Sequence, residues 1–180
     1  MTTPRQEAQW VLRAQCDDRE ALESLLRSIQ PSLRRFVAGV VGPSYADDVL
    51  QNTFVIISCK IKSLHTPELF RPWVYRIASR EAFRQLKRER RWSDREAQEL
   101  ELDDLPAPHV RPPAELLEEL LSLDEVSPAS RAVLALHFHE ELTLAEIAAI
   151  LELPLGTVKS RLAYGLSAVR KHLSKKRGDS

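Results

Sequence analysis

Apolar residues recur every three to four positions through most of this chain, and no long stretch alternates as a β-strand does. That spacing places them on one face of an α-helix. The pattern fails between Trp92 and Pro113, where four prolines fall within residues 106–113. We therefore expect an all-α chain with two small helical domains, 1–91 and 114–180, joined by an acidic, proline-containing linker at 92–113.

Short motifs in the first domain predict where its helices begin. Residues 5–28 divide into two helices near Asp17-Asp18, and Pro31 is expected to begin another. Gly42-Pro43-Ser44 indicates a turn, after which Ser44 and the acid three residues later resemble a capping box. Thr66-Pro67 predicts a further start, with a threonine cap and proline at the first helical position.

The second domain carries similar signals. Ser127-Pro128 predicts one helix start, and the capping box Thr143 to Glu146 predicts another. Pro154 should stop that helix, and a last helix can run from Gly156 into the basic C-terminal segment.

Length and composition fit an ordinary globular protein. With 43% apolar residues over 180 positions, each domain can form a core. There is no apolar run of membrane-spanning length and no signal pattern, so we expect a cytoplasmic protein without membrane insertion. Cys16 and Cys59 stand singly, which argues against a disulfide framework or a zinc site, and both are expected to be buried.

The formal net charge of zero hides a strong segregation of charge. Residues 71–91 hold eight Lys or Arg and two Glu, and residues 156–177 hold seven basic side chains and no acidic one. Between them, residues 93–125 carry eleven acidic and two basic side chains. Two basic blocks around an acidic connector suggest contact with a polyanion at two separate places, although a charge run is often only a solvated face.

Residues 143–166 predict two helices around a short turn. Ala148 is small enough for a close crossing, and Val158 and Leu162 should face inward. This is a helix-turn-helix pattern, whose second helix lies in the DNA major groove. The side chains expected to reach bases or phosphates are Thr157, Lys159, Ser160, Arg161 and Tyr164. A helical hairpin inside a bundle is the alternative interpretation.

Residues 70–91 predict a helix with one basic stripe. The stripe consists of Arg76, Arg80, Arg84, Lys87, Arg88 and Arg91. A phosphate path fits such a stripe, and Trp73 and Tyr75 near its start offer planar surfaces for unpaired bases. For Trp73, packing in the core is the alternative.

These segments together resemble the extracytoplasmic-function sigma factors of the sigma-70 family. DDVLQNTF at 47–54 is similar to the family's polymerase-binding segment, and FRPWVYRIA at 70–78 to its signature before the helix that reads the −10 element. ELTLAEIAAILELPLGTVKSRL at 141–162 is similar to the region that reads the −35 element, and is the most specific single match. The resemblance covers nearly the whole chain, and the segments stand in the family's order.

The resemblance implies a sigma factor that binds core RNA polymerase and directs promoter-specific initiation, commonly in stress responses. A sigma2-like domain would bind the beta-prime clamp helices and capture the opened −10 strand, and a sigma4-like domain, with the beta flap as a further contact, would read the −35 duplex. The polymerase-binding residues would be Asp47, Asp48, Gln51, Asn52 and Phe54. The acidic linker would lie in the RNA exit path. An anti-sigma factor is the implied regulator, and the active protein would be associated with the nucleoid.

Two other functions account for parts of the sequence. A stand-alone regulator would use the helix-turn-helix on duplex DNA, but it would not need the segments at 47–54 and 70–78. A metal-dependent nuclease would use Asp47 and Asp48, or Asp103 and Asp104, to hold a metal. It is disfavoured because two adjacent acids on a helix point about 100° apart, and no catalytic motif is present. His137 and His139, two residues apart, are expected to be partly exposed helix residues. We therefore expect no enzymatic activity, cofactor or metal.

The chain departs from the family pattern at four positions. Arg80 and Arg84 stand where the family commonly has Asn or Asp, so base recognition there is expected to differ. Glu152 replaces a frequent turn glycine. Gly165 is expected to weaken the last helix by about 1 kcal/mol relative to alanine.

Overall fold

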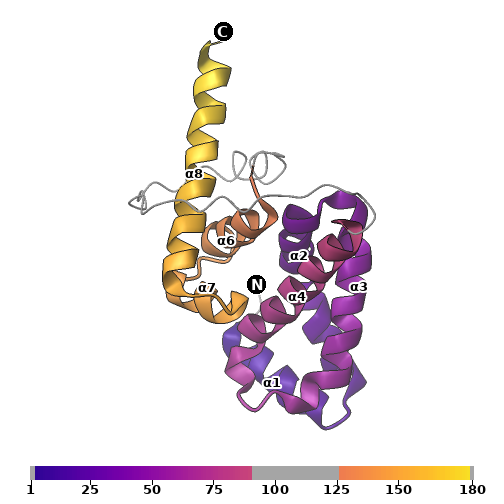
Figure 1. The fold of residues 1–180 in the computed structure, drawn as a ribbon. Coiled ribbons are helices and arrows are strands. Elements are labelled where there is room, and N and C mark those ends of the chain that lie inside the picture. The colour runs from indigo at the N-terminus through magenta and orange to yellow at the C-terminus, as the bar shows by residue number, and fades with distance from the viewer. Residues whose placement is uncertain (1–2, 91–125, 179–180) are drawn as a thin grey trace. The chain divides into compact units, whose positions relative to one another are not determined.

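The structure is a computed structural model that describes residues 3–90 and 126–178. Every regular element in these two stretches is a helix, which confirms the all-α prediction (Figure 1). Contacts divide the chain into two compact units, Met1–Glu89 and Arg90–Ser180. The linker expected at 92–113 and the domain start expected at 114 lie outside the described residues, so those boundaries stay predictions.

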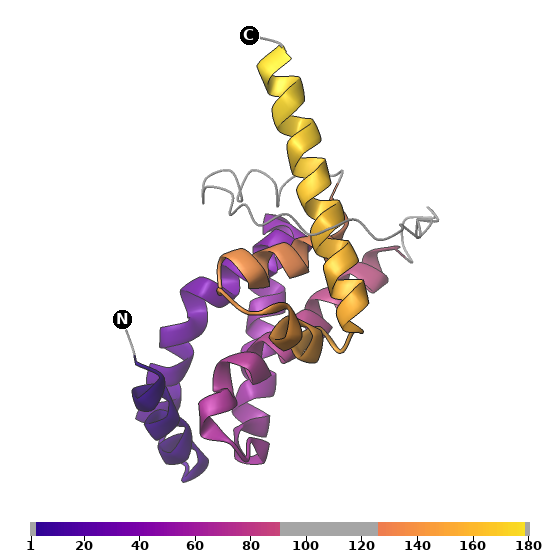
Figure 2. The same cartoon turned by 90° about the vertical axis from the view of Figure 1, so that its left-hand side faces the viewer.

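The first unit is a bundle of α-helices with two 3-10 turns before its last helix (Figures 1 and 2). In chain order its elements are α1 Pro4–Gln15, α2 Arg19–Val41, α3 Pro43–Lys60, η1 Ile61–Ser63, η2 Pro67–Leu69 and α4 Phe70–Arg90. Every α-helix sends apolar side chains into one core, among them the fully buried Val11, Leu25, Ile57 and Val74. Removing this apolar surface from water stabilises the bundle.

The break between α1 and α2 falls where the sequence predicted it. Asp17 takes a left-handed conformation (φ 64°), and the Asp18 carboxylate caps α2 by accepting a 3.0 Å hydrogen bond from the Ala21 amide. That bond has the largest effect on the pKa of Asp18 and, with a second bond from the Arg13 side chain, holds it below its ordinary value. The predicted break between two helices near Asp17-Asp18 is therefore confirmed.

The prediction that Pro31 begins a new helix is wrong, because Pro31 lies inside α2. Proline removes one amide donor from the helix and crowds the carbonyl four residues earlier. On either side of it, Ile29 and Leu33 are fully buried on one face of the same helix. Burial of that continuous apolar face outweighs the local cost of the proline.

The start of α3 also differs from the prediction. Gly42, at a positive φ of 83°, is the N-cap, Pro43 follows at the first position, and no side chain caps the helix. Ser44 is therefore already inside the helix, and the carboxylate of Asp47 bonds Arg34 of α2. Thr66-Pro67 opens the short turn η2 before α4, and the Thr66 side chain makes no capping bond.

The second unit holds three described helices, α6 Pro128–Phe138, α7 Leu144–Leu151 and α8 Leu155–Gly178. Ser127 caps α6, and Thr143 and Glu146 form a reciprocal capping box on α7, as predicted. The turn after α7 contains Pro154, and α8 begins just before Gly156. Val158 and Leu162 of α8 face inward, at 0% and 3% exposure.

Two unusual residues shape this unit. Glu152, the C-cap of α7, adopts a left-handed conformation (φ 58°, ψ 44°) despite its side chain. Gly165 of α8 is buried against Leu134 of α6, whose Cδ1 would lie 2.7 Å from any Cβ added there. The glycine therefore lets two helices approach closely, and this packing offsets the lower helix propensity of glycine.

The cysteine prediction is wrong, since Cys16 and Cys59 are both exposed. Each lies at the end of a helix and does not share the three-to-four-residue spacing of the buried side chains. His137 is half-buried near the end of α6, and its Nδ1 lies 2.9 Å from the Leu142 carbonyl. His139 is half-buried just after that helix. Among the described residues, none of the helices is both long and apolar enough to cross a membrane.

Candidate polymerase and promoter interfaces

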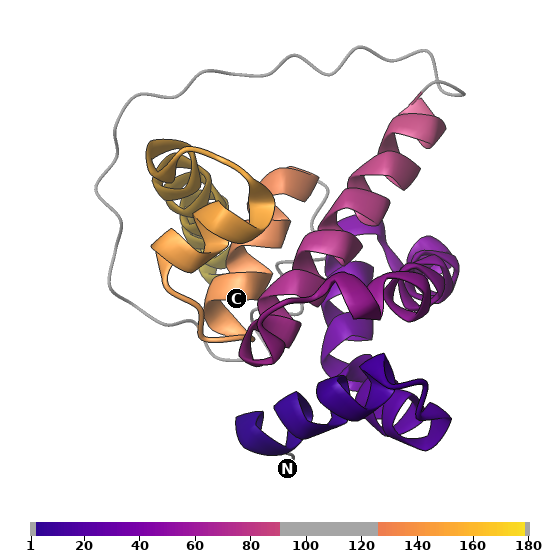
Figure 3. The ribbon, with the colours of Figure 1, turned by 90° about the horizontal axis from the view of Figure 1, so that it is seen from below.

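The predicted basic stripe runs along α4, which Figure 3 shows as one unbroken helix. Arg80, Arg84, Lys87 and Arg88 are exposed, and Arg76 is half-buried. Arg91 lies outside the described residues. The three-to-four-residue spacing places these cations along one side of α4, as a phosphate backbone requires. We call Arg76, Arg80, Arg84, Lys87 and Arg88 the basic stripe.

Arg84 of the basic stripe is held by an internal partner. The Arg84 guanidinium lies 2.6 Å from the carboxylate of Glu81, one turn earlier on α4. The Glu81 side chain is only 9% exposed, whereas that of Arg84 is 65% exposed. The carboxylate therefore orients a side chain that remains accessible to a ligand.

The two aromatic residues at the start of α4 have different environments. Tyr75 is 1% exposed, and its ring packs edge-on against Phe36 of α2 with centroids 5.3 Å apart. Its ring therefore belongs to the core and presents no face for a base to stack on. Trp73 is half-buried beside Phe70, with centroids 6.4 Å apart. Of the pair, Trp73 alone keeps accessible ring surface.

The residues of the expected polymerase-binding segment lie together on α3. Four of them are exposed and Phe54 is half-buried; the exposed ones are Asp47, Asp48, Gln51 and Asn52. Asp47 accepts hydrogen bonds of 2.8 and 3.4 Å from Arg34, which raise the pKa of that guanidinium. Asp47 is thus already engaged within the unit. We call Asp47, Asp48, Gln51, Asn52 and Phe54 the α3 face.

Sequence reasoning missed one residue next to the α3 face. Val55 is 58% exposed, although valine is usually buried. It lies four residues after Gln51 and three after Asn52, which places it on the same side of α3. The sequence could have predicted this exposure, because Val55 does not fall on the four-residue spacing of the buried Val49, Thr53 and Ile57.

The helix-turn-helix residues lie on the first three turns of α8. Lys159 is exposed, and Thr157, Ser160, Arg161 and Tyr164 are half-buried. The Ser160 hydroxyl donates a 3.0 Å hydrogen bond to the Thr157 carbonyl, one turn earlier. Since Val158 and Leu162 face the core, the side chains between them point outward. Helix α8 can therefore present one polar, basic face to a groove.

No group suited to metal chemistry appears in residues 3–90 and 126–178. Within those ranges, three or more His, Cys, Asp or Glu side chains nowhere gather as a metal-binding set would. The chemistry that the described surfaces offer is ionic contact, hydrogen bonding and stacking.

Two family models match the chain at the positions of these surfaces. Sigma-70 region 2 matches residues 25–92, and sigma-70 region 4 matches residues 122–171. The RNA polymerase sigma-H factor of Pseudomonas aeruginosa is 27% identical, over 96% of each chain. The ECF RNA polymerase sigma factor SigW of Bacillus subtilis is 29% identical, over 71% of this chain and 75% of SigW.

A solved structure shares the fold. The sigma factor RpoE of Bartonella quintana, determined in complex with the anti-sigma factor NepR, matches with a TM-score of 0.65 and 22% identity. The match covers 84% of this chain and 96% of RpoE. Two region models in the family's order, with relatives similar along nearly the whole chain, place this protein in the extracytoplasmic-function group of the sigma-70 family, the factors that direct promoter-specific transcription initiation.

Proposed function

We propose that this sigma factor binds core RNA polymerase through the α3 face and reads its promoter with α4 and α8. The observation that carries the proposal is that three separate helices each bury their apolar side and expose the expected polar side. Packing of a helical bundle explains the buried faces, but it does not require the exposed faces of these helices to carry charged and polar side chains at the expected positions.

The basic stripe and Trp73 support capture of the −10 element as a single strand. The cations can follow the phosphate backbone, and the ring of Trp73 offers a stacking surface for an unstacked base. Stacking is available only to a base of the opened strand, so together with the phosphate contacts it can offset lost base pairing without nucleotide hydrolysis. Tyr75 is not part of this proposal because its ring is in the core.

The first turns of α8 support contact with the −35 element as duplex DNA. Lys159 and Arg161 carry positive charge, and Thr157 and Tyr164 can donate hydrogen bonds to bases or phosphates. The second helix of a helix-turn-helix enters the major groove with its N-terminal residues. We place these residues of α8 in that groove.

The family and the fold also suggest how activity is controlled. Because the structurally similar RpoE was determined with an anti-sigma factor, we propose that an anti-sigma factor restrains this chain as well. The protein would act in the cytoplasm, join the nucleoid when active and carry out no chemical step itself.

The test is binding of the purified protein to bacterial core RNA polymerase, comparing wild type with Asp48→Arg. Asp48 is exposed on the α3 face, so reversing its charge should abolish tight binding and the promoter-specific transcripts that depend on it. Glu23→Arg is the matched control, because Glu23 is exposed on α2, away from the α3 face, and pairs with the exposed Arg27. Duplex binding by the free protein without any binding to core would instead indicate a stand-alone regulator.

A further inference from the structure

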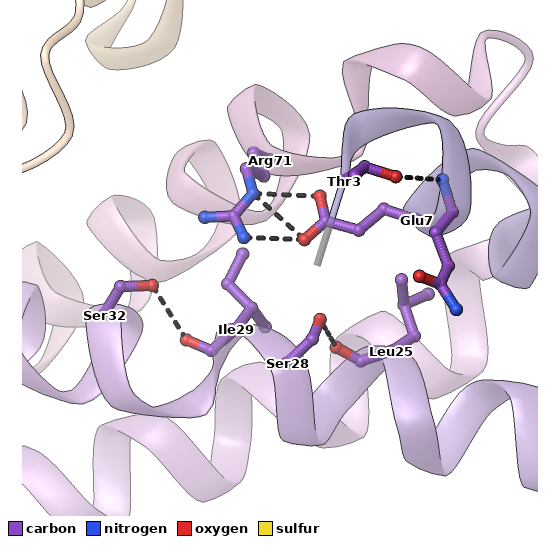
Figure 4. A network of polar contacts seen from close by, with 8 residues as sticks. Thr3, Glu7, Leu25, Ser28, Ile29, Ser32 and Arg71 are labelled. Carbon is purple, nitrogen blue, oxygen red and sulfur yellow. Dashed lines mark hydrogen bonds and ion pairs between the residues drawn. The ribbon is translucent and has the colours of Figure 1, made fainter. Parts of the chain in front are cut away.

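An ion pair joins the first helix to the start of the promoter-reading helix. Arg71, the second residue of α4, donates hydrogen bonds of 2.6, 2.9 and 3.2 Å to the two carboxylate oxygens of Glu7 in α1 (Figure 4). The Glu7 side chain is 5% exposed and that of Arg71 is 39% exposed. A carboxylate buried to this degree requires such a partner, and the two-pronged geometry fixes the relative orientation of both groups.

Two further polar links join the C-terminal end of α1 to the segment before α4. Gln15, the last residue of α1, donates hydrogen bonds of 3.0 Å to the Ile61 carbonyl and 2.7 Å to the Leu64 carbonyl. Asp17, just beyond α1, accepts a 2.8 Å hydrogen bond from Lys62. Together with the Glu7 pair, these bonds hold the chain at both ends of the segment 61–71.

That segment connects the α3 face to α4. It leaves α3 after Lys60, passes through η1 and η2, and enters α4 at Phe70. Ile61, Leu64 and Phe70 bury their side chains, while the polar links fix the backbone and the first turn of α4. The position of Trp73, two residues after Arg71, therefore depends on α1, which lies more than fifty residues earlier in the sequence.

We infer that α1 is a positioning element for −10 recognition, with Glu7 as the positioning residue and Arg71 as its internal partner. The inference rests on the proposed function and adds a role that lies outside the matched region 2, which begins at residue 25. It also removes Arg71 from the charges available to DNA, although Arg71 belongs to the same basic block in the sequence. Glu7 acts through Arg71 and α4, and does not touch DNA.

The experiment uses holoenzyme reconstituted with the full chain, and measures two quantities for each variant. One is affinity for core polymerase, and the other is promoter opening, read from permanganate reactivity of −10 thymines. In Glu7→Gln, core affinity should stay unchanged because the α3 face is intact. Opening should fall about tenfold, the size expected when charge-assisted hydrogen bonds that hold a group in place are lost.

Three further variants separate positioning from simple unfolding. Gln15→Ala cuts an independent link and should lower opening in the same selective way. The exchange Glu7→Arg with Arg71→Glu restores an ion pair and should recover most of the opening lost in Glu7→Gln. Glu23→Gln, which breaks the exposed pair with Arg27, should change neither quantity.

Wild-type opening in Glu7→Gln and Gln15→Ala, with core affinity intact, would overturn the inference. So would a loss of opening in Arg71→Gln that the Glu7 variant does not share, because Arg71 would then be acting on DNA directly. Failure of the wild-type protein to bind core or open a promoter would instead remove the proposed function, which keeps the two failures distinct.

Discussion

At the scale of single residues, Gly165 shows how packing can reverse an expectation from helix propensity. Alanine favours a helix over glycine by about 1 kcal/mol, so the sequence alone suggests that Gly165→Ala should stabilise α8. The added Cβ would lie 2.7 Å from Cδ1 and 3.1 Å from Cγ of the fully buried Leu134. We predict that the substitution lowers the free energy of unfolding by about 1–3 kcal/mol.

Urea unfolding followed by circular dichroism, with hydrogen exchange of the α6 and α8 amides, measures this effect. Gly156→Ala is the matched control, because Gly156 lies in the same helix and a Cβ there would have nothing within 4 Å. It should be neutral or slightly stabilising. Equal behaviour of the two variants would mean that the contact with Leu134 relaxes at no cost.

Glu152 leads to a second prediction at this scale. A side chain in the left-handed region costs about 1–2 kcal/mol, and glycine avoids that cost while losing some entropy. Glu152→Gly should therefore raise the free energy of unfolding by about 0.5–1 kcal/mol. Glu152→Ala removes the same carboxylate but keeps the strained backbone (φ 58°), and should not stabilise. The same unfolding measurements decide between relief of strain and loss of charge.

At the scale of elements, the pH dependence of α7 follows from its capping box. Glu146 accepts a 2.7 Å hydrogen bond from the Thr143 hydroxyl and one of 2.8 Å from the Thr143 amide. These bonds hold the pKa of Glu146 below its ordinary value of 4.5, and the bond from the hydroxyl has the larger effect. The folded form thus binds fewer protons than the unfolded chain just below pH 4.5, so the stabilisation is complete above that pH and is lost on further acidification.

We predict that Glu146→Gln reduces the acid-dependent part of the stability of α7, measured as amide protection in that helix between neutral pH and about pH 3. Glu140, for which the structure shows no capping bond, is the matched position for a control Glu140→Gln. An unchanged acid profile in the Glu146 variant would show that the capping box does not hold in solution.

Helix starts were predicted correctly where a side chain caps the first turn, and were predicted wrongly where tertiary packing decided. Ser127 and Thr143 cap as expected because capping is local. Pro31 gives the same local signal as a helix start, yet the buried face from Ile29 to Leu33 keeps α2 continuous. A start signal alone does not reveal whether the preceding helix already has a partner to pack against.

At the scale of the whole molecule, zero net charge conceals two basic blocks along the chain. If the basic stripe follows phosphates, affinity falls with salt concentration, and removing one cation that contacts a phosphate should reduce the steepness of log affinity against log salt by about 0.7–0.9. We predict such a change for Lys87→Gln in promoter binding by the holoenzyme. Lys60→Gln changes the same charge at an exposed position on α3 and should leave the slope unaltered. Equal slopes for both variants would remove Lys87 from the phosphate path.

The family and the order of its segments could be read from the sequence, whereas the internal connections of the first unit could not. Arg71 belongs to a basic block, and Glu7 lies far from it in an N-terminal stretch with no motif. Only the fold brings their charges together. The same reason explains Tyr75, since the edge-on contact with Phe36 of α2 is invisible in the spacing of α4.

The exposure of the two cysteines has a practical consequence. Accessible thiols react with maleimide dyes without unfolding the protein, so the natural sequence carries its own labelling positions. Cys16 stands between Gln15 and Asp17, the two residues that hold the segment before α4. In a Cys59→Ser background, a single dye at Cys16 becomes a fluorescent reporter next to that junction, able to show in real time whether it stays fixed as a promoter opens.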